Sequence, residues 1–206
     1  KAHYPAEFMA AVLSNRGGFY DACAYTEETR RMGIRILPPD IQLSDEPFTA
    51  RHSTVRVGLS QVKGLSQNSI GEILKNRPYT SLADFLARTK VSVSETESLI
   101  RCGAFNTFGI SVAELLWQLN LHHRSPRLFS QFNQPIPKLP EYTLREKLLA
   151  ELECLDLTVS NHPLSLYSFN KKFTQTAIRG SQLEKFSGKL ATLIGWAITY
   201  KRTRTA

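Results

Sequence analysis

The chain has 206 residues, 42% of them hydrophobic, which allows one or two compact domains with a real core. Lys and Arg outnumber Asp and Glu by 26 to 18, and the resulting net charge of +8 suits a polyanionic partner such as nucleic acid. On charge alone, a merely basic soluble protein is an equal alternative. Three scattered cysteines, no apolar run of membrane-spanning length and no secretory h-region argue against a metal-binding, membrane or secreted protein and favour a reducing, cytoplasmic setting.

Two helices and a short extended run are predicted for residues 1–50. Pro5 suits the first turn of a helix that ends at Gly17-Gly18. A second helix over residues 20–32 ends at Gly33, and residues 34–37 form an extended run before Pro38-Pro39. Both ends of the chain, Lys1 and KRTRTA, look cut, so we expect a piece of a larger protein.

Short helices are predicted from about residue 58 to 121, after a short strand or helix entry at residues 54–59. Each helix start is marked by a serine followed three residues later by an acidic residue, which satisfies the first N–H groups of a helix: Ser81 with Asp84, Ser94 with Glu97, and Ser111 with Glu114. Four prolines make residues 122–140 a linker. Thr143 and Glu146 then cap a helix with one leucine face (Leu144, Leu148, Leu152, Leu155), and residues 189–200 alternate like a β-strand.

The stretch QVKGLSQNSIGEIL, residues 61–74, places a lysine and a glycine at a bend just before a helix start. Glycine permits positive φ and close approach of the main chain to a ligand. The first N–H groups of the following helix have no intrahelical partner and lie at its positive dipole end, which suits a backbone phosphate of DNA. We therefore predict a helix-hairpin-helix phosphate clamp formed by Lys63, Gly64, Leu65, Ser66, Gln67 and Asn68, with Lys75 and Arg77 reaching an adjoining phosphate.

A second bend, LIRCGAFNTFG at residues 99–109, repeats the pattern more weakly. Arg101 and Gly103 would face the second strand of a duplex. Two alternatives stay open: both glycines only end helices, or the apolar Gly103 bend is the structural mate of the first hairpin.

These segments resemble bacterial C-family DNA polymerases, that is, the alpha subunit of DNA polymerase III and its error-prone relatives. KAHYPAEFMAAVLSN and GFYDACAYTEETRRMGIRILPPDI resemble the end of the fingers region. RVGLSQVKGLSQNSIGEIL, SLADFLART and LIRCGAFNTFG resemble the tandem helix-hairpin-helix region, and LATLIGWAITYKRTRT resembles the first strand of the OB domain.

The resemblance implies a mainly α fold with five parts: the end of the fingers (1–50), a tandem helix-hairpin-helix domain (51–121), a Pro-rich linker (122–140), a helical connection (141–188) and the start of an OB domain (189–206). It implies a non-catalytic segment that grips duplex DNA during template-directed synthesis, with Mg²⁺ held by palm aspartates that these residues do not include. Two other functions compete: a helix-hairpin-helix module of a repair ligase or nuclease, and a helical interaction scaffold that binds no DNA.

Further partners follow from the same resemblance. Leu128 and Phe129 match the apolar pair of a sliding-clamp motif whose glutamine is replaced by Ser125, so they either bind the clamp and other replisome subunits or anchor the linker. Lys201, Arg202 and Arg204 would line a single-strand groove of the OB domain or form a solvated hairpin tip. Trp196 is expected to fill the barrel rather than stack on bases.

Overall fold

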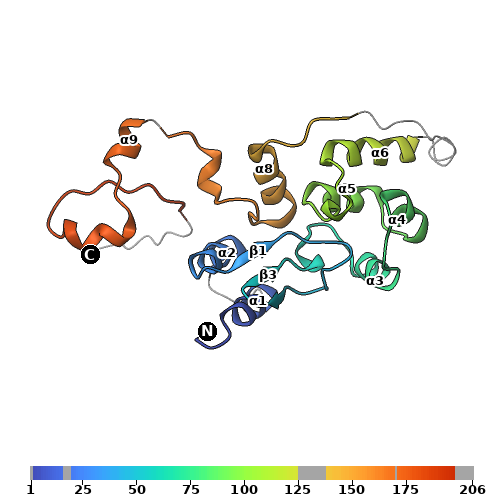
Figure 1. Ribbon diagram of the computed structural model, residues 1–206, viewed down its shortest axis with the longest axis horizontal. Helices are drawn as coiled ribbons and strands as arrows, with labels where there is room; N and C mark the ends of the chain where they lie inside the picture. The colour runs from blue at the N-terminus through green and yellow to red at the C-terminus, as the bar shows by residue number, and fades with distance from the viewer. Residues whose placement is uncertain (1, 16–19, 125–137, 170, 198–206) are drawn as a thin grey trace, which may run out of the picture.

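The computed structural model describes residues 2–15, 20–124, 138–169 and 171–197. The fold is mainly α with one small sheet, as predicted (Figure 1). Two N-terminal helices and the sheet form one part, a group of short helices follows, and α8 lies beside both; the C-terminal residues extend away from them. Within the described residues, no helix is long and apolar enough to span a bilayer.

The sheet of the N-terminal part has three strands of three residues each, β1 (Arg35–Leu37), β2 (Thr49–Arg51) and β3 (Thr54–Arg56). β3 is central, parallel to β1 and antiparallel to β2, with Val55 opposite both Ile36 and Ala50. α1 (Pro5–Asn15) packs on β2 and β3, and α2 (Ala22–Arg31) packs on α1 and β1. The predicted helices and the β1 and β3 segments are confirmed, whereas the sequence pattern did not indicate β2.

Short helices fill the central part, as predicted. They are η1 (Leu59–Gln61), α3 (Gln67–Lys75), α4 (Leu82–Arg88), α5 (Val93–Arg101), η2 (Asn106–Phe108) and α6 (Val112–Arg124). Their core contains a chain of aromatic rings: Tyr79 and Phe105 each contact Phe85 at 5.0 Å between ring centroids, and Phe108 contacts Phe105 at 5.9 Å. Edge-on ring contacts of this kind stabilise a core beyond the area they bury.

The helix starts follow the predicted capping chemistry with one correction. Ser81 caps α4, Ser111 and Glu114 bond reciprocally at the start of α6, and Thr143 forms a capping box with Glu146. The box expected at Ser94 and Glu97 is wrong, because α5 begins two residues earlier with Ser92 as its N-cap and Glu95 as the acidic partner. Both registers fit the sequence pattern, and the earlier one also places Glu95 within reach of α3.

α8 (Leu144–Leu155) packs on α5, and the loop that follows it contacts α2 of the N-terminal part. Leu148 and Leu155 are fully buried, whereas Leu144 is 47% exposed, so only part of the predicted leucine face is used. The loop after α8 is held from both sides. The buried Glu151 carboxylate accepts hydrogen bonds from the N–H groups of Val159 and Ser160, and Arg30 of α2 donates to the Thr158 and Val159 carbonyls at 2.6 and 2.9 Å.

The C-terminal residues contain η3 (Pro163–Leu166), α9 (Lys171–Thr176) and η4 (Gly180–Phe186). Residues 189–197, the described part of the expected strand, form no strand and carry a single β-bridge between Ala177 and Thr192. Leu190 is 99% exposed, and Trp196, expected inside a barrel, is 36% exposed and lies 6.1 Å from the Tyr167 ring. Alternation produces a strand only where neighbouring strands pair with it, and the described residues supply none. Residues 198–206 lie outside the described part of the chain.

Candidate nucleic-acid interface

The predicted bend between η1 and α3 is present. Gly64 has φ of +78°, the left-handed conformation that favours glycine. A Cβ placed there would meet nothing within 4 Å, so the glycine is required by the backbone conformation and not by crowding inside the protein. The open space above Gly64 leaves the main chain accessible from outside.

Three backbone N–H groups at this bend are available to a ligand. Ser66 is the N-cap of α3, and its hydroxyl accepts a hydrogen bond from the Ser69 N–H. Among the described residues, none accepts a hydrogen bond from the N–H of Gly64, Gln67 or Asn68. Gln67 and Asn68 are exposed and occupy the first turn of α3, where unpaired N–H groups and the helix dipole together attract an anion.

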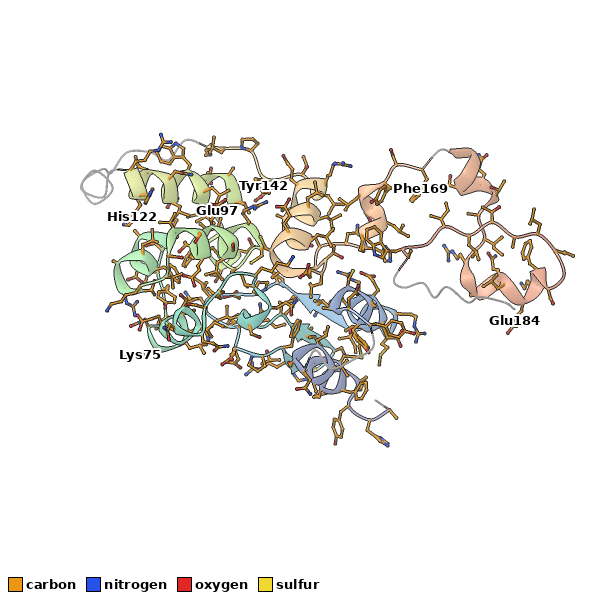
Figure 2. The ribbon with its side chains drawn as sticks, turned by 180° about the vertical axis from the view of Figure 1, so that it is seen from behind. Lys75, Glu97, His122, Tyr142, Phe169 and Glu184 are labelled. Atoms are coloured by element: carbon orange, nitrogen blue, oxygen red, sulfur yellow. The ribbon has the colours of Figure 1, made fainter. Side chains whose placement is uncertain are left out.

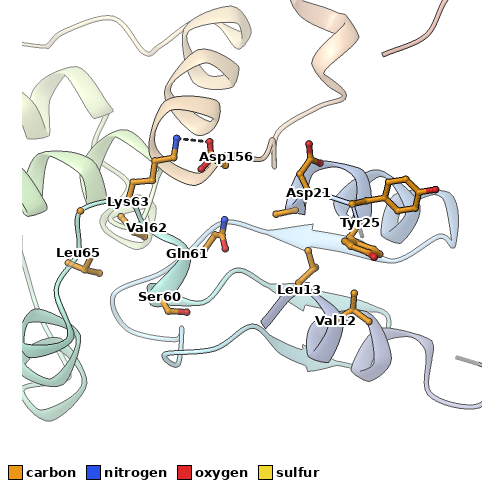
Figure 3. A pocket seen from close by; sticks show the side chains of 13 residues that line it. Val12, Leu13, Asp21, Tyr25, Ser60, Gln61, Val62, Lys63, Leu65 and Asp156 are labelled. Atoms are coloured by element: carbon orange, nitrogen blue, oxygen red, sulfur yellow. Dashed lines mark ion pairs between the residues drawn. The ribbon is translucent and has the colours of Figure 1, made fainter. Parts of the chain in front are cut away.

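Lys63, predicted to contact phosphate, is already engaged by the end of α8 (Figure 3). Its Nζ lies 2.6 Å from Asp156 Oδ1, and its backbone N–H donates to the Cys154 carbonyl at 2.8 Å. Gln61 Nε2 donates to the Leu155 carbonyl at 2.6 Å. The bend therefore satisfies two carbonyls that would otherwise be unpaired at the C-terminus of α8, and the Lys63 charge lies at the negative end of that helix.

Glu95 of α5 connects the starts of two helices. Its Oε1 accepts from the Ser66 N–H at 2.9 Å and from the Ser69 hydroxyl at 2.8 Å, both at the start of α3. Its Oε2 accepts from the N–H and hydroxyl of Ser92 at 2.9 and 2.7 Å, at the start of α5. Burial acts to raise the pKa of Glu95, but these hydrogen bonds outweigh it and hold the pKa at about 2. One carboxylate thus fixes the bend relative to α5.

Hollows lie on both sides of the bend. A cleft of about 510 Å³ lies between the end of α1, the start of α2, the bend and Asp156 (Figure 3). A groove of about 700 Å³ runs along α3 and includes Gln67, Asn68, Lys75 and Lys90. Lys75 lies at the outer end of α3 (Figure 2). The groove also contains Glu72 and Glu95, so its charge is mixed.

Arg77 does not extend toward the groove. Its Nε donates to the Ile41 carbonyl at 2.5 Å, and its guanidinium also bonds the Ser44 carbonyl. Burial lowers the pKa of Arg77 from its ordinary value, although Asp45 opposes this shift. The side chain fixes the loop between β1 and β2 to the end of α3, a structural role that the sequence did not indicate.

The second bend differs from the first. Gly103 has φ of +84° and ends α5, with its N–H bonded to the Ile100 carbonyl and the Ala104 N–H bonded to the Leu99 carbonyl. This is the double hydrogen-bond pattern of a glycine helix end. Ala104 and Phe105 are fully buried, and Arg101 pairs with Glu153 of α8. The geometry favours the alternative in which Gly103 ends a helix.

Several predicted groups lie outside the described residues: Leu128 and Phe129 of the clamp motif, and Lys201, Arg202 and Arg204. Within the described ranges, no three His, Cys, Asp or Glu side chains converge on a metal position. Asp156 and Glu95 also lie beside the bend, and the sequence pattern did not indicate either as its neighbour. Glu95 is recognisable as the acidic member of a capping box, whereas nothing local marks Asp156.

Comparison with known proteins identifies the relatives of the chain. A family described as "Helix-hairpin-helix motif" matches residues 33–115. The chain is 34% identical over 200 residues to DNA polymerase III subunit alpha of Saccharopolyspora erythraea, covering 80% of the chain and 16% of the relative. It is 34% identical over 195 residues to the same subunit of Bacillus subtilis (84% and 17%) and 32% identical over 169 residues to the error-prone DNA polymerase of Corynebacterium efficiens (81% and 16%).

The chain spans about one sixth of the length of these relatives. The alignments nevertheless cover 80% to 84% of this chain, and the motif match includes both bends. The chain is therefore homologous to one segment of bacterial DNA polymerase III alpha subunits and error-prone DNA polymerases, as its resemblance to them predicted.

Proposed function

We propose that this chain binds the phosphodiester backbone of duplex DNA through the bend at Lys63–Asn68, as a non-catalytic segment of a bacterial replicative or error-prone polymerase. The observation that carries the proposal is the set of unpaired N–H groups at Gly64, Gln67 and Asn68, which surround a bend within the matched helix-hairpin-helix motif. Amide donors fit phosphate oxygens and carry no base information, so binding should show little sequence preference.

The polymerase relatives support a setting in the bacterial cytoplasm during template-directed synthesis. Nucleotide transfer and its Mg²⁺ stay assigned by the resemblance to palm aspartates in another part of such an enzyme. Contacts with single-stranded DNA through residues 201–204, and with a sliding clamp or other replisome subunits through Leu128 and Phe129, stay predictions. A repair ligase or nuclease module is a weaker alternative, because the relatives that the chain matches are polymerases.

The proposal is tested by duplex binding over a range of salt concentrations. A labelled duplex without a special sequence is titrated with the 206-residue chain, and fluorescence anisotropy gives the affinity. Each phosphate neutralised by the protein should steepen the fall of log affinity with log salt by about 0.9. Weak binding that does not change with salt would favour the interaction scaffold over DNA binding.

The bend is tested by Gly64→Val with Gly33→Val as its matched control. Both glycines have nearly the same φ, +78° and +77°, and a Cβ at either position would meet nothing within 4 Å. The two variants should therefore lose similar stability by thermal melting. Only Gly64→Val should weaken duplex binding, by about tenfold or more, since hydrogen bonds to a charged group contribute about 1.5–3 kcal/mol each. Equal affinities for two folded variants would reject the bend as the contact.

A further inference from the structure

The bend and the end of α8 are joined by three contacts, in which Gln61 and Lys63 meet the consecutive positions 154–156. Gln61 Nε2 bonds the Leu155 carbonyl, the Lys63 N–H bonds the Cys154 carbonyl, and Lys63 Nζ pairs with Asp156 (Figure 3). The first two contacts involve main-chain groups of α8 and fix the position of the bend. The third involves two side chains and is not needed for that purpose.

The Lys63–Asp156 pair is open to solvent. The Lys63 side chain is 46% exposed and the Asp156 side chain 68% exposed, so an incoming phosphate reaches Nζ without opening the core. Carboxylate and phosphate oxygens are both anionic acceptors for an ammonium group. The Asp156 carboxylate therefore occupies a position on Lys63 that a DNA phosphate would take.

The backbone at residue 156 does not require an aspartate. Asp156 follows α8 with φ of +56°, a conformation that glycine and asparagine also adopt readily. The other acidic residue in the cleft, Asp21, has a separate role, since its carboxylate caps α2 by accepting from the Ala24 N–H at 2.8 Å. Asp21 thus caps a helix, whereas the Asp156 carboxylate pairs with Lys63 and caps no helix start.

We propose that Asp156 is a positioning residue that holds Lys63 in the absence of DNA and competes with the phosphodiester backbone for its ammonium group. The proposal rests on the proposed function, because it concerns the affinity of the same bend for duplex DNA. It assigns to the end of α8 a direct influence on that affinity: the Lys63 charge becomes available to a phosphate only when its pair with Asp156 separates.

The test is a double-mutant cycle with Asp156→Asn, Lys63→Ala and the double variant, measured by duplex anisotropy over a range of salt concentrations. Asparagine keeps the shape and tolerates the backbone conformation, and Asp156→Gly is a second variant that also suits positive φ. Asp156→Asn should bind duplex about two- to fivefold more tightly, as expected for release from an exposed ion pair. Its salt dependence should steepen by up to about 0.9, because Lys63 then displaces one more counterion.

The gain should disappear when Lys63 is absent, so Lys63→Ala and the double variant should bind equally. Glu97→Gln removes one exposed negative charge elsewhere and reports the general charge effect. A gain that persists without Lys63, or that Glu97→Gln reproduces in full, overturns the proposal. Unchanged or weaker binding by Asp156→Asn, while the wild-type chain shows salt-dependent binding, overturns it and leaves the proposed function standing. Absence of salt-dependent binding in wild type and Asp156→Asn alike rejects both.

Discussion

The Glu95 carboxylate of α5 accepts a hydrogen bond from the backbone N–H of Ser66, the N-cap of α3, at 2.9 Å. Its other oxygen accepts from the N–H of Ser92, the N-cap of α5. The starts of two helices therefore share one carboxylate, and the orientation of the bend relative to α5 depends on a single side chain.

Glu95→Gln should destabilise the chain by about 1–3 kcal/mol, because an amide cannot accept hydrogen bonds on both sides and each lost cap contributes about 1 kcal/mol. Urea unfolding measures the change. Glu97→Gln, on the exposed side of the same helix, is the control and should lie within about 0.5 kcal/mol of wild type. Equal losses in the two variants would show that the shared carboxylate has no special structural role.

The stability of the chain should depend on the ionisation of Glu95 at acid pH. Burial favours a raised pKa, but hydrogen bonds from Ser92, Ser66 and Ser69 lower the pKa of Glu95 from 4.5 to about 2 in the folded chain. A lowered pKa in the folded state contributes stability above pH 4.5, and this contribution is lost as the pH falls from 4.5 toward 2. Urea midpoints measured from pH 7 to pH 3 should decline less in Glu95→Gln than in wild type. Parallel declines would contradict the assignment.

Glu151→Gln should destabilise the connection after α8. Glu151 is buried and accepts hydrogen bonds from the Val159 and Ser160 N–H groups at 2.7 and 3.0 Å. In the glutamine variant, the side-chain NH2 group would face a backbone N–H group, and neither can accept a hydrogen bond. The expected loss is about 1–3 kcal/mol by urea unfolding. Glu153→Gln, two residues along, breaks a surface pair with Arg101 and should cost less than about 1 kcal/mol. The reverse order of the two losses would disprove the role given to Glu151.

Gly58→Ala should be among the most damaging small substitutions. A Cβ at Gly58 would overlap the backbone of Glu46 and Pro47, which cannot rotate away as a side chain can. The expected loss is about 3 kcal/mol by thermal or urea unfolding. In contrast, Gly71→Ala meets open space inside α3 and should stabilise the chain by up to about 1 kcal/mol. A Gly58→Ala chain as stable as wild type would mean that the backbone of Glu46 and Pro47, in the loop before β2, does not lie against Gly58.

The helical part of the fold was predictable because its signals are local. Ser81, Ser111 and Thr143 mark helix starts through side chains that bond only three residues away, and glycine marks the positive-φ bend at Gly64. The start of α5 was misplaced by two residues because two serine–glutamate pairs fit the same pattern. The observed pair, Ser92 with Glu95, also brings Glu95 into contact with Ser66 at the start of α3, which is distant in sequence.

The site was less predictable because its charges are balanced by residues far along the chain. Lys63 and Arg77 have the sequence context of exposed phosphate ligands, but Asp156 pairs with the first and the carbonyls of Ile41 and Ser44 bind the second. Neither partner can be inferred from local spacing. The β2 strand was missed for a related reason, since three residues become a strand only through pairing with β3.

The contacts between the bend and α8 also bear on how the chain acquires its structure during synthesis. Gln61 and the Leu155 carbonyl that it bonds are 94 residues apart. The segment that we assign to DNA is therefore translated long before the helix that holds it in place. A nascent chain that stops short of residue 144 would carry the whole motif sequence yet lack its support, so the bend should become ordered late, together with α8.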